Sequence, residues 1–397
     1  MTRLRVLHVS PYFAPAFRYG GPPRSILGLC QGLQQSGVEV EVLTTAADGP
    51  TDLPQATDGR YDGVPVQYVP TAFPRRFFGA HMAAPLAEAL SRTDLCHIHG
   101  IWNVPEWSAA RLARRHHVPY VVSPRGMLLP AALGRGRWRK RIAYEIVERG
   151  NLRRAALLHA TSDEEADRLR SLVPHVPVVV VPNGVDVDAA RRAAPDFRPR
   201  LGIPADAFVI VFLGRMHRIK RLDLLAEAFA DLRGRHAHAH LVLAGPDEEN
   251  ILSGIRDSLK PHAGFVHTLE TLTDDEKWAL LKSADASVQC SDSESFGLAV
   301  VEALAAGTPV VVTRTCPWAE IESRRCGFWV EQTPAAIARA LSVLVEDPAG
   351  QAAMGERGAA FARERFSWRA IGRQMSDHYA GLVTAGADAW RDAPVMP

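Results

Sequence analysis

Two glutamates, Glu294 and Glu302, stand eight positions apart in the stretch SDSESFGLAVVEALAAGTP, which covers residues 291–309. The small and apolar residues between them predict a helix that begins near Phe296 and ends at Ala306. The N–H groups of its first turn would bind an anion, because a helix N-terminus carries unpaired donors and partial positive charge. One carboxylate beside that site and one deeper along the helix suit a ligand with central phosphates and hydroxyl groups at both ends, such as a nucleotide sugar. Acids that only complement the helix dipole are the simpler alternative, which the spacing alone leaves open.

Short apolar runs bounded by turn signals would position these residues. The first half of the chain has such runs at 4–10, 38–45, 95–100, 118–124, 156–162 and 176–184, and the second half at 207–214, 239–245, 264–269, 286–291 and 308–313. Helical stretches separate them, which indicates parallel sheets covered on both faces. The pattern restarts near Pro182-Asn183-Gly184, so the predicted fold class is α/β, with two facing Rossmann-like doubly wound domains and a ligand cleft between them.

Length and composition agree with two globular domains. The chain has 397 residues, 47% of them apolar and 23% charged, and no apolar run approaches the roughly 20 residues of a membrane-spanning helix. The N-terminal segment reads as a first strand rather than a signal peptide, which predicts a cytoplasmic protein. Five scattered cysteines without CxxC spacing indicate reduced thiols, and a net charge of +2 argues against nucleic acid as a partner.

Three common nucleotide or nucleophile motifs are missing from the sequence. The first strand is not followed by GxGxxG, which weakens an oxidoreductase interpretation. GxxxxGK[ST] and GxSxG are also absent, which weakens the interpretations as a nucleotide-hydrolysing P-loop protein or an α/β-hydrolase.

The string SxSESFGLxxxEALAAGTPVV is very similar to the E-x7-E signature of the retaining glycosyltransferases of family 4, the group 1 type, whose fold is called GT-B. Three further motifs resemble that family in the expected order: Gly214-Arg215 with Lys220, the AGPD of residues 244–247, and the NGVD of residues 183–186. The resemblance spans nearly the whole chain. It implies an acceptor domain at 1–182, joined by a returning helix at 366–385, a donor domain at 183–365, and a flexible tail at 386–397.

The resemblance assigns roles to the donor-site residues. It implies that Arg215 and Lys220 bind the donor diphosphate, a task that suits a bidentate guanidinium and a lysine point charge; a solvated basic loop is the alternative. Glu294 is expected on the donor-sugar hydroxyls and Glu302 on the ribose. The remaining donor contacts are expected from the loop at the helix start and from the base pocket: Ser295, the backbone N–H groups of Phe296, Gly297 and Leu298, and Val266. The usual glycine after the strand of Val266 is replaced in VHTLET, which leaves the base undetermined among UDP-, GDP- and ADP-sugars.

Acceptor-side candidates follow strands of the first half. Gly20 and Gly21 can let a phosphate or sugar approach the backbone, although a plain turn explains them nearly as well. His97 and His99 point the same way on a strand, and the resemblance makes His99 an active-site residue near the donor sugar, with Arg125 a secondary candidate. No metal site is expected here or at the alternating histidines of residues 236–240.

Two basic, aromatic segments of the first half suggest an anionic membrane surface or a lipid-linked acceptor as partner. They are residues 74–78, PRRFF, and residues 134–144, which place Arg135, Arg137, Arg139, Lys140 and Arg141 around Trp138. A solvated helix face is the alternative. The enzyme would then be cytoplasmic or peripheral on the inner face of the membrane, with a lipid-linked or oligosaccharide acceptor.

The resulting hypothesis is a retaining, metal-independent hexosyltransferase of surface-polysaccharide synthesis, with Glu294, His99, Arg215 and Lys220 as its catalytic group and no cofactor beyond the donor. Arg215, Lys220 and the helix N-terminus would stabilise the leaving diphosphate. Whether Glu294 is a covalent nucleophile or only positions the donor stays open. A GT-B nucleotide-sugar epimerase and a non-catalytic nucleotide-sugar-binding module are the alternatives.

Overall fold

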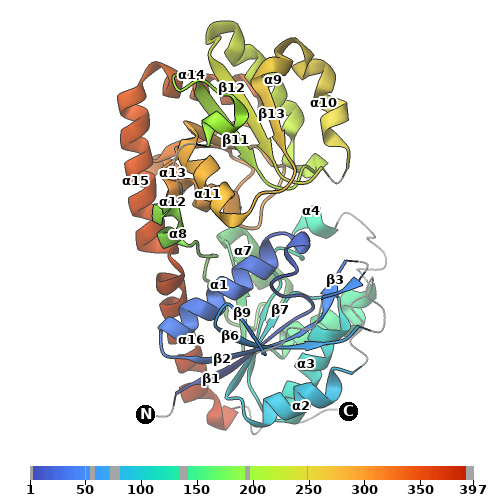
Figure 1. Cartoon of the computed structure of the whole chain (residues 1–397). Helices are drawn as coiled ribbons and strands as arrows, with labels where there is room; N and C mark the ends of the chain where they lie inside the picture. Colours follow the sequence, from blue (N-terminus) through green and yellow to red (C-terminus); the bar gives the residue numbers. More distant parts are fainter. Residues whose placement is uncertain are drawn as a thin grey trace. The chain divides into compact units, whose positions relative to one another are not determined.

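The computed structural model describes residues 3–49, 51–53, 59–71, 81–133, 142–192, 197–247 and 249–389 (Figure 1). The chain forms two compact units: unit 1 comprises Met1–Gly184 and Trp368–Pro397, and unit 2 comprises Val185–Ser367. Each unit holds a predominantly parallel sheet covered by helices, so the predicted α/β fold class with two Rossmann-like domains is confirmed.

The sheet of unit 1 has the order β10-β9-β8-β7-β1-β2-β6-β5. Its strands are β1 (Arg5–Ser10), β2 (Glu39–Thr45), β5 (Arg60–Tyr61), β6 (Val64–Val69), β7 (Leu95–His99), β8 (Tyr120–Ser123), β9 (Leu157–Ala160) and β10 (Val178–Val180). All pair in parallel except the short β5, and β3 (Ala47–Asp48) and β4 (Thr51–Asp52) form a separate ribbon. Strand order reverses between β1 and β7, and doubly wound sheets bind ligands at the carboxyl ends of the strands at such a point.

Helices cover both faces of this sheet, and successive side chains of β1 pack on opposite faces. Leu7 and Val9 pack toward α2 (Ala83–Ser91), α3 (Val104–Arg115) and α7 (Asp163–Leu172). Val6 packs on the other face, with α1 (Gly21–Gln35) and α16 (Trp368–Ala389). Shorter segments complete the unit: the 3-10 turn Phe17–Tyr19, α4 (Pro130–Leu133), the π-helical turn η3 (Tyr144–Glu148) and α6 (Arg149–Arg153).

The sheet of unit 2 has the order β13-β12-β11-β14-β15-β16, and its strand order reverses between β11 and β14. Its strands are β11 (Phe208–Leu213), β12 (Ala239–Ala244), β13 (Val266–Leu269), β14 (Ala286–Gln289), β15 (Val310–Thr313) and β16 (Gly327–Val330), and all pair in parallel. Its helices are α8 (Val187–Arg192), α9 (Leu222–Arg235), α10 (Ile251–Leu259), α11 (Asp274–Ser283), α12 (Leu298–Ala306), α13 (Glu320–Ser323), α14 (Pro334–Glu346) and α15 (Pro348–Phe366), with 3-10 turns at Arg198–Leu201, Arg218–Lys220 and Lys260–Phe265.

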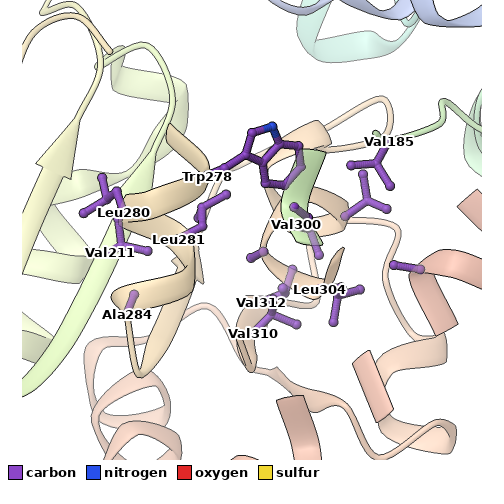
Figure 2. Close-up of a cluster of buried hydrophobic side chains, with 14 of the residues drawn as sticks. Val185, Val211, Trp278, Leu280, Leu281, Ala284, Val300, Leu304, Val310 and Val312 are labelled. Atoms are coloured by element: carbon purple, nitrogen blue, oxygen red, sulfur yellow. The ribbon is translucent and has the colours of Figure 1, made fainter. Parts of the chain in front are cut away.

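The two cores of unit 2 lie on opposite faces of its sheet. Figure 2 shows one of them, in which Val211, Leu281 and Val300 join the sheet to α11 and α12. The other core packs Phe208, Ile210 and Phe212 of the same β11 against α9, α10 and α14. Each fully buried side chain of this size contributes roughly 1.5–3 kcal/mol, so the two cores fix the strand ends that carry the candidate site.

Some elements differ from the sequence expectation for identifiable reasons. β6 alternates buried and exposed residues, including Pro65 and Gln67, whereas the predicted strands were continuous apolar runs. β16 was also missed; it begins with Gly327, and its other three residues are only partly buried, so it does not appear as a buried apolar run. The C-terminal helix starts at Trp368 and continues to Ala389, so most of the predicted helix is present but part of the predicted tail at 386–397 is helical.

The two basic segments proposed for a membrane surface lie mostly outside the described residues: 74–78 entirely, and 134–144 except for Ile142, Ala143 and Tyr144. Among the described residues, helices both long and apolar enough to span a bilayer are absent.

Candidate active site

The predicted donor residues follow the two strands of unit 2 that flank the reversal of strand order. Arg215 and Lys220 follow β11, and Glu294 follows β14. These strands are neighbours in the sheet, with Ile210 opposite Ala286, so their carboxyl ends meet at the expected position for a ligand.

Lys220 is the last residue of the 3-10 turn Arg218–Lys220, and His217 is the N-cap of this turn. The His217 side chain accepts a hydrogen bond from the Ile219 N–H at 3.2 Å. Arg221 then adopts a left-handed conformation with φ of 52°, which ends the turn and starts α9. The Asp292 N–H donates to the Ile219 carbonyl at 2.8 Å, which holds the loop of Lys220 against the loop of Glu294.

Lys220 and Glu294 form an ion pair through Nζ and Oε1. The Ser291 hydroxyl donates to the same Oε1 at 2.9 Å. The side chains of Lys220 and Glu294 are 21% and 14% exposed, so the pair is partly screened yet within reach of a ligand. A ligand phosphate could replace Glu294 as the partner of Lys220 and leave the carboxylate to accept hydrogen bonds from hydroxyl groups.

Helix α12 starts at Leu298, after the Gly297 cap, rather than at Phe296. Gly297 has φ of 85°, a left-handed conformation that favours glycine. Phe296 is buried with Trp318 and Phe366 at ring-centroid distances of 5.2 and 5.8 Å, so its side chain anchors the turn in the core. Among the described residues, none accepts a hydrogen bond from the backbone N–H of Phe296, Gly297 or Leu298, which keeps these donors for a ligand.

Arg215 is exposed, directly after Gly214 at the end of β11. The end of the neighbouring strand β12 also requires glycine, because a Cβ at Gly245 would lie 2.0 Å from the Gly214 carbonyl oxygen. Two glycines therefore bring the backbones of the β11 and β12 ends into contact, next to the exposed Arg215.

Glu302 lies inside α12 and forms an ion pair that the sequence did not reveal. Lys277 Nζ of α11 lies 2.7 Å from Glu302 Oε1, and the two side chains are 13% and 15% exposed. Lys277 also lies 3.4 Å from Asp274 and within 4.8 Å of the Trp278 ring centroid. Lys277 was missed because nothing in the sequence relates a position on α11 to one on α12.

Val266 does not lie with the other donor residues. It is the first residue of β13, paired with Leu241, and packs against the core on the α9 face. The carboxyl end of β13 is at Leu269, whose carbonyl accepts the Gly245 N–H at 2.7 Å. The structure therefore brings the segment after Leu269, and not Val266, toward the glycine edge.

In unit 1, Gly20 caps α1 and Gly21 is its first residue, so these glycines form the N-terminus of a 15-residue helix. Ser25 of the same helix accepts a hydrogen bond at 2.7 Å from Arg125, which follows β8. Arg125 also lies 3.1 Å from His99 Nδ1 and donates to the Asn183 side chain at 3.3 Å. The structure thus brings Arg125 and His99 together with the helix that begins at Gly21.

His99 belongs to four buried histidines, His8, His97, His99 and His159, which we call the histidine cluster. His99 was expected to face a ligand, but it is only 1% exposed and both of its ring nitrogens have partners: Arg125 at Nδ1, and His8 at Nε2 at 2.8 Å. His99 therefore does not face a ligand in this structure and instead contacts Arg125. Arg125 is itself half-buried and keeps its charge, since burial lowers the pKa of Arg125 only to about 10.

Hydrogen bonding assigns a neutral tautomer to each member of the histidine cluster. The Val181 carbonyl can only accept, so His159 donates from Nε2 and accepts at Nδ1 from His97. Tyr379 of α16 then donates to His97 Nδ1 at 2.6 Å. Arg125 donates to His99, which leaves His99 Nε2 to donate to His8. Burial lowers the pKa of His8 and of His159 to about 3, and lowers those of His97 and His99 well below the usual value.

Three members of the cluster have the spacing of metal ligands. One ring nitrogen each of His8, His97 and His99 lies within 4.8 Å of the others. The Arg125 guanidinium bonded to His99 places a positive charge beside them, which opposes a cation at this position. The arrangement fits a neutral hydrogen-bonded network better than a metal centre.

Comparisons with protein families match both halves of the chain. Residues 194–361 match the family model "Glycosyl transferases group 1", and residues 20–184 match "Glycosyl transferase 4-like domain". The D-inositol 3-phosphate glycosyltransferase of Kineococcus radiotolerans is 31% identical, over 95% of this chain and 94% of its own. The protein of that name from Streptomyces scabiei is 33% identical, over 95% of this chain and 90% of its own.

Solved structures share the fold. Anabaena Alr3699/HepE in complex with UDP and glucose has a TM-score of 0.75 at 19% identity, over 96% of this chain and all of that chain. WaaG, a glycosyltransferase involved in lipopolysaccharide biosynthesis, has a TM-score of 0.69 at 18% identity, over 95% of this chain and all of that one. At these identities the likeness concerns the fold alone.

Proposed function

Because the chain belongs to the group 1, family 4 glycosyltransferases, we propose that it moves a hexose with retention of configuration from a nucleoside-diphosphate sugar to a hydroxyl of a glycan or lipid-linked acceptor. The observation that carries this proposal is the carboxyl edge of the unit 2 sheet. There Lys220 and Glu294 form a partly exposed ion pair, next to the uncapped first turn of α12.

Charge stabilisation is the main catalytic effect in this proposal. Cleavage of the anomeric bond leaves negative charge on the β-phosphate, and Lys220, Arg215 and the α12 N–H groups face that charge. The phosphate takes the place of Glu294 beside Lys220. Glu294 then accepts hydrogen bonds from the sugar hydroxyls, while Glu302, held by Lys277, binds the ribose diol.

The acceptor attacks on the face from which the diphosphate departs. The acceptor oxygen bonds to the anomeric carbon as the bond to the β-phosphate oxygen breaks, and that phosphate oxygen takes the acceptor proton. No separate general base is needed. Glu294 is a weak candidate for a covalent nucleophile in this proposal, because its carboxylate accepts hydrogen bonds from Ser291 and from the sugar hydroxyls. Lysine and arginine supply the positive charge, so the proposal includes no metal or cofactor.

The acceptor is proposed to be a saccharide of surface-polysaccharide synthesis, bound by unit 1. A second candidate is D-inositol 3-phosphate, which the names of relatives about 30% identical along nearly their whole length favour. The two acceptors differ in charge, because only the second needs a phosphate site in unit 1.

We also propose an anionic membrane surface as a partner. Ile142 and Ile146, which are 50% and 75% exposed, lie one helical turn apart directly after the basic segment at 134–141. Exposed isoleucines beside cationic residues suit an interfacial helix. Binding to vesicles that contain anionic lipid, compared with neutral vesicles, tests this part; equal binding to both would remove it.

The experiment for the whole proposal is a panel of UDP-, GDP- and ADP-sugars with and without acceptor glycosides or D-inositol 3-phosphate. Nucleotide release that requires both an intact donor and an acceptor supports transfer. Release without an acceptor, together with an altered sugar, would favour the epimerase. Tight nucleotide binding without any turnover would favour the non-catalytic module.

A further inference from the structure

A strained backbone conformation occurs in unit 1, in the loop that follows β7. Trp102, three residues after His99, has φ of 83°. A bulky side chain rarely adopts this left-handed conformation, which costs on average about 1–3 kcal/mol and therefore persists only where the surroundings impose it. Such strain is typical of binding sites, so the loop requires an explanation beyond folding.

The surroundings that impose this conformation are unusual as well. Glu148 is 2% exposed, and its Oε1 accepts both the Trp102 backbone N–H and the Trp107 indole N–H, each at 2.6 Å. Glu148 ends the π-helical turn η3, a rare irregularity that is frequent at functional sites. Burial raises the pKa of Glu148, so the buried carboxylate that latches Trp102 is itself unfavourable for folding.

A second buried acid supports the same loop. Glu106 is 3% exposed, and its Oε1 accepts from the Asn103 side chain at 3.0 Å, while Oε2 has no partner among the described residues. Burial raises the pKa of Glu106 to about 8. A glycine at 102 and apolar residues at 106 and 148 would form a loop at lower cost, so stability alone does not account for this arrangement.

The two tryptophans of the loop differ in a way that identifies the one used for binding. The Trp107 indole N–H is taken by Glu148. The Trp102 indole N–H donates to none of the described residues, and the Trp102 ring is only partly buried. Trp102 therefore combines a backbone held by Glu148, a partly exposed ring that packs against the core, and an indole N–H donor. It stands three residues after His99, in the loop that follows β7, where the strand order reverses beside β1.

We propose that Trp102 is the platform on which the hydroxylated six-membered ring of the acceptor stacks, and that Glu148 is the positioning residue that holds it. The apolar C–H face of such a ring matches the indole face, and the indole N–H donates to a ring hydroxyl. A sugar and a cyclitol share this chemistry. The inference rests on the proposed function, because it assigns the acceptor of that same transfer reaction.

The test is steady-state kinetics with saturating donor and varied acceptor, using methyl glycosides in one arm and D-inositol 3-phosphate in the other. Trp102→Ala should raise the acceptor KM at least about tenfold and leave the donor KM within about twofold. Trp102→Phe keeps the stacking surface but lacks the N–H, so its acceptor KM should lie between those of the wild type and Trp102→Ala. The acceptor whose KM rises in Trp102→Ala, the glycoside or D-inositol 3-phosphate, is the one that stacks on Trp102. An unchanged acceptor KM, or an equal loss for donor and acceptor, would overturn the proposal.

Two further measurements test the hydrogen bond from Glu148 to Trp102 and the strained backbone of Trp102. Glu148→Gln keeps an oxygen acceptor and should retain the wild-type acceptor KM, whereas Glu148→Leu should raise it as Trp102→Ala does, with the donor KM unchanged. Trp102→Gly should unfold at the same temperature as Trp102→Ala or higher, which reverses the usual order of glycine and alanine. A lower unfolding temperature for Trp102→Gly would contradict the strain.

Ring binding can also be measured without turnover, which separates this inference from the proposed function. Saturation-transfer NMR with methyl glycosides and with D-inositol 3-phosphate should show binding to the wild type and its loss in Trp102→Ala. If the wild type binds nucleotide but neither ring, or if both proteins bind the rings equally, the platform is refuted. If the rings bind but no donor is turned over, the proposed transferase activity fails and the platform stands.

Discussion

Substitution of Lys220 by methionine removes the charge at the end of the 3-10 turn and keeps most of the side-chain volume. A unit charge about 4 Å from the leaving phosphate contributes roughly 4 kcal/mol at an effective dielectric constant near 20. The Lys220 side chain is 21% exposed, so solvent screens part of this interaction, and about 3 kcal/mol is the expected loss. Transition-state theory converts that loss into a fall in turnover of roughly a hundredfold.

The ion pair with Glu294 complicates a single substitution, because Lys220→Met also leaves a partly buried carboxylate without its cation. Lys220→Met should therefore lower the free energy of unfolding by about 1–2 kcal/mol. The double variant Lys220→Met/Glu294→Gln should recover that stability without recovering turnover. Urea denaturation and initial rates on the same preparations separate the two effects.

Arg218 provides the matched control, since it lies in the same turn with a side chain that is 67% exposed. Arg218→Met should change turnover less than about twofold, because an exposed charge is screened. The reasoning would be refuted if Lys220→Met turned over at the wild-type rate, or if Arg218→Met lost as much activity as Lys220→Met.

Three further outcomes are expected. Lys277→Met should raise the donor KM about fivefold to tenfold with a smaller effect on kcat, because Glu302 loses its partner at 2.7 Å; an unchanged donor KM in initial-rate assays would separate Glu302 from the ribose. Gly245→Ala should lower the free energy of unfolding in urea by about 2–3 kcal/mol, because the new Cβ would stand 2.0 Å from the Gly214 carbonyl oxygen, and a wild-type midpoint would contradict the packing. The histidine cluster stays neutral in the folded protein, whereas its members would bind protons below about pH 6.5 in the unfolded chain. The free energy of unfolding should therefore fall as the pH decreases from about 6.5 toward 3, by about 1 kcal/mol per histidine and pH unit. Melting temperatures by circular dichroism that do not change between pH 7 and pH 5 would contradict this.

Most strand positions of both sheets could be predicted because parallel strands buried on both faces appear as continuous apolar runs. The loop from Ser291 to Gly297 could be located because an apolar strand precedes it and a small-residue helix follows it. β6 escaped because it is half-buried at one side of the sheet and contains Pro65.

The partners of the two glutamates could not be predicted from the sequence. Lys220 and Glu294 are 74 positions apart, and only the pairing of β11 with β14 brings their loops together. Lys277 reaches Glu302 through the packing of α11 on α12, a tertiary contact without a local signal.

The unit 1 site was the least predictable part. His99 has a recognisable place at a strand end, but its burial against His8 and Arg125 depends on three separate strands. The left-handed conformation of Trp102 could not be predicted, because bulky residues such as tryptophan rarely adopt a positive φ.

The central claim is that the glycine-lined cationic edge of the unit 2 sheet binds the donor diphosphate. A crystal structure of the protein soaked with UDP or GDP tests it most directly. The account predicts the β-phosphate within hydrogen-bond distance of Lys220, Arg215 and the N–H groups at the start of α12, with Glu294 separated from Lys220. Nucleotide bound at another position, with the Lys220–Glu294 pair intact, would contradict it.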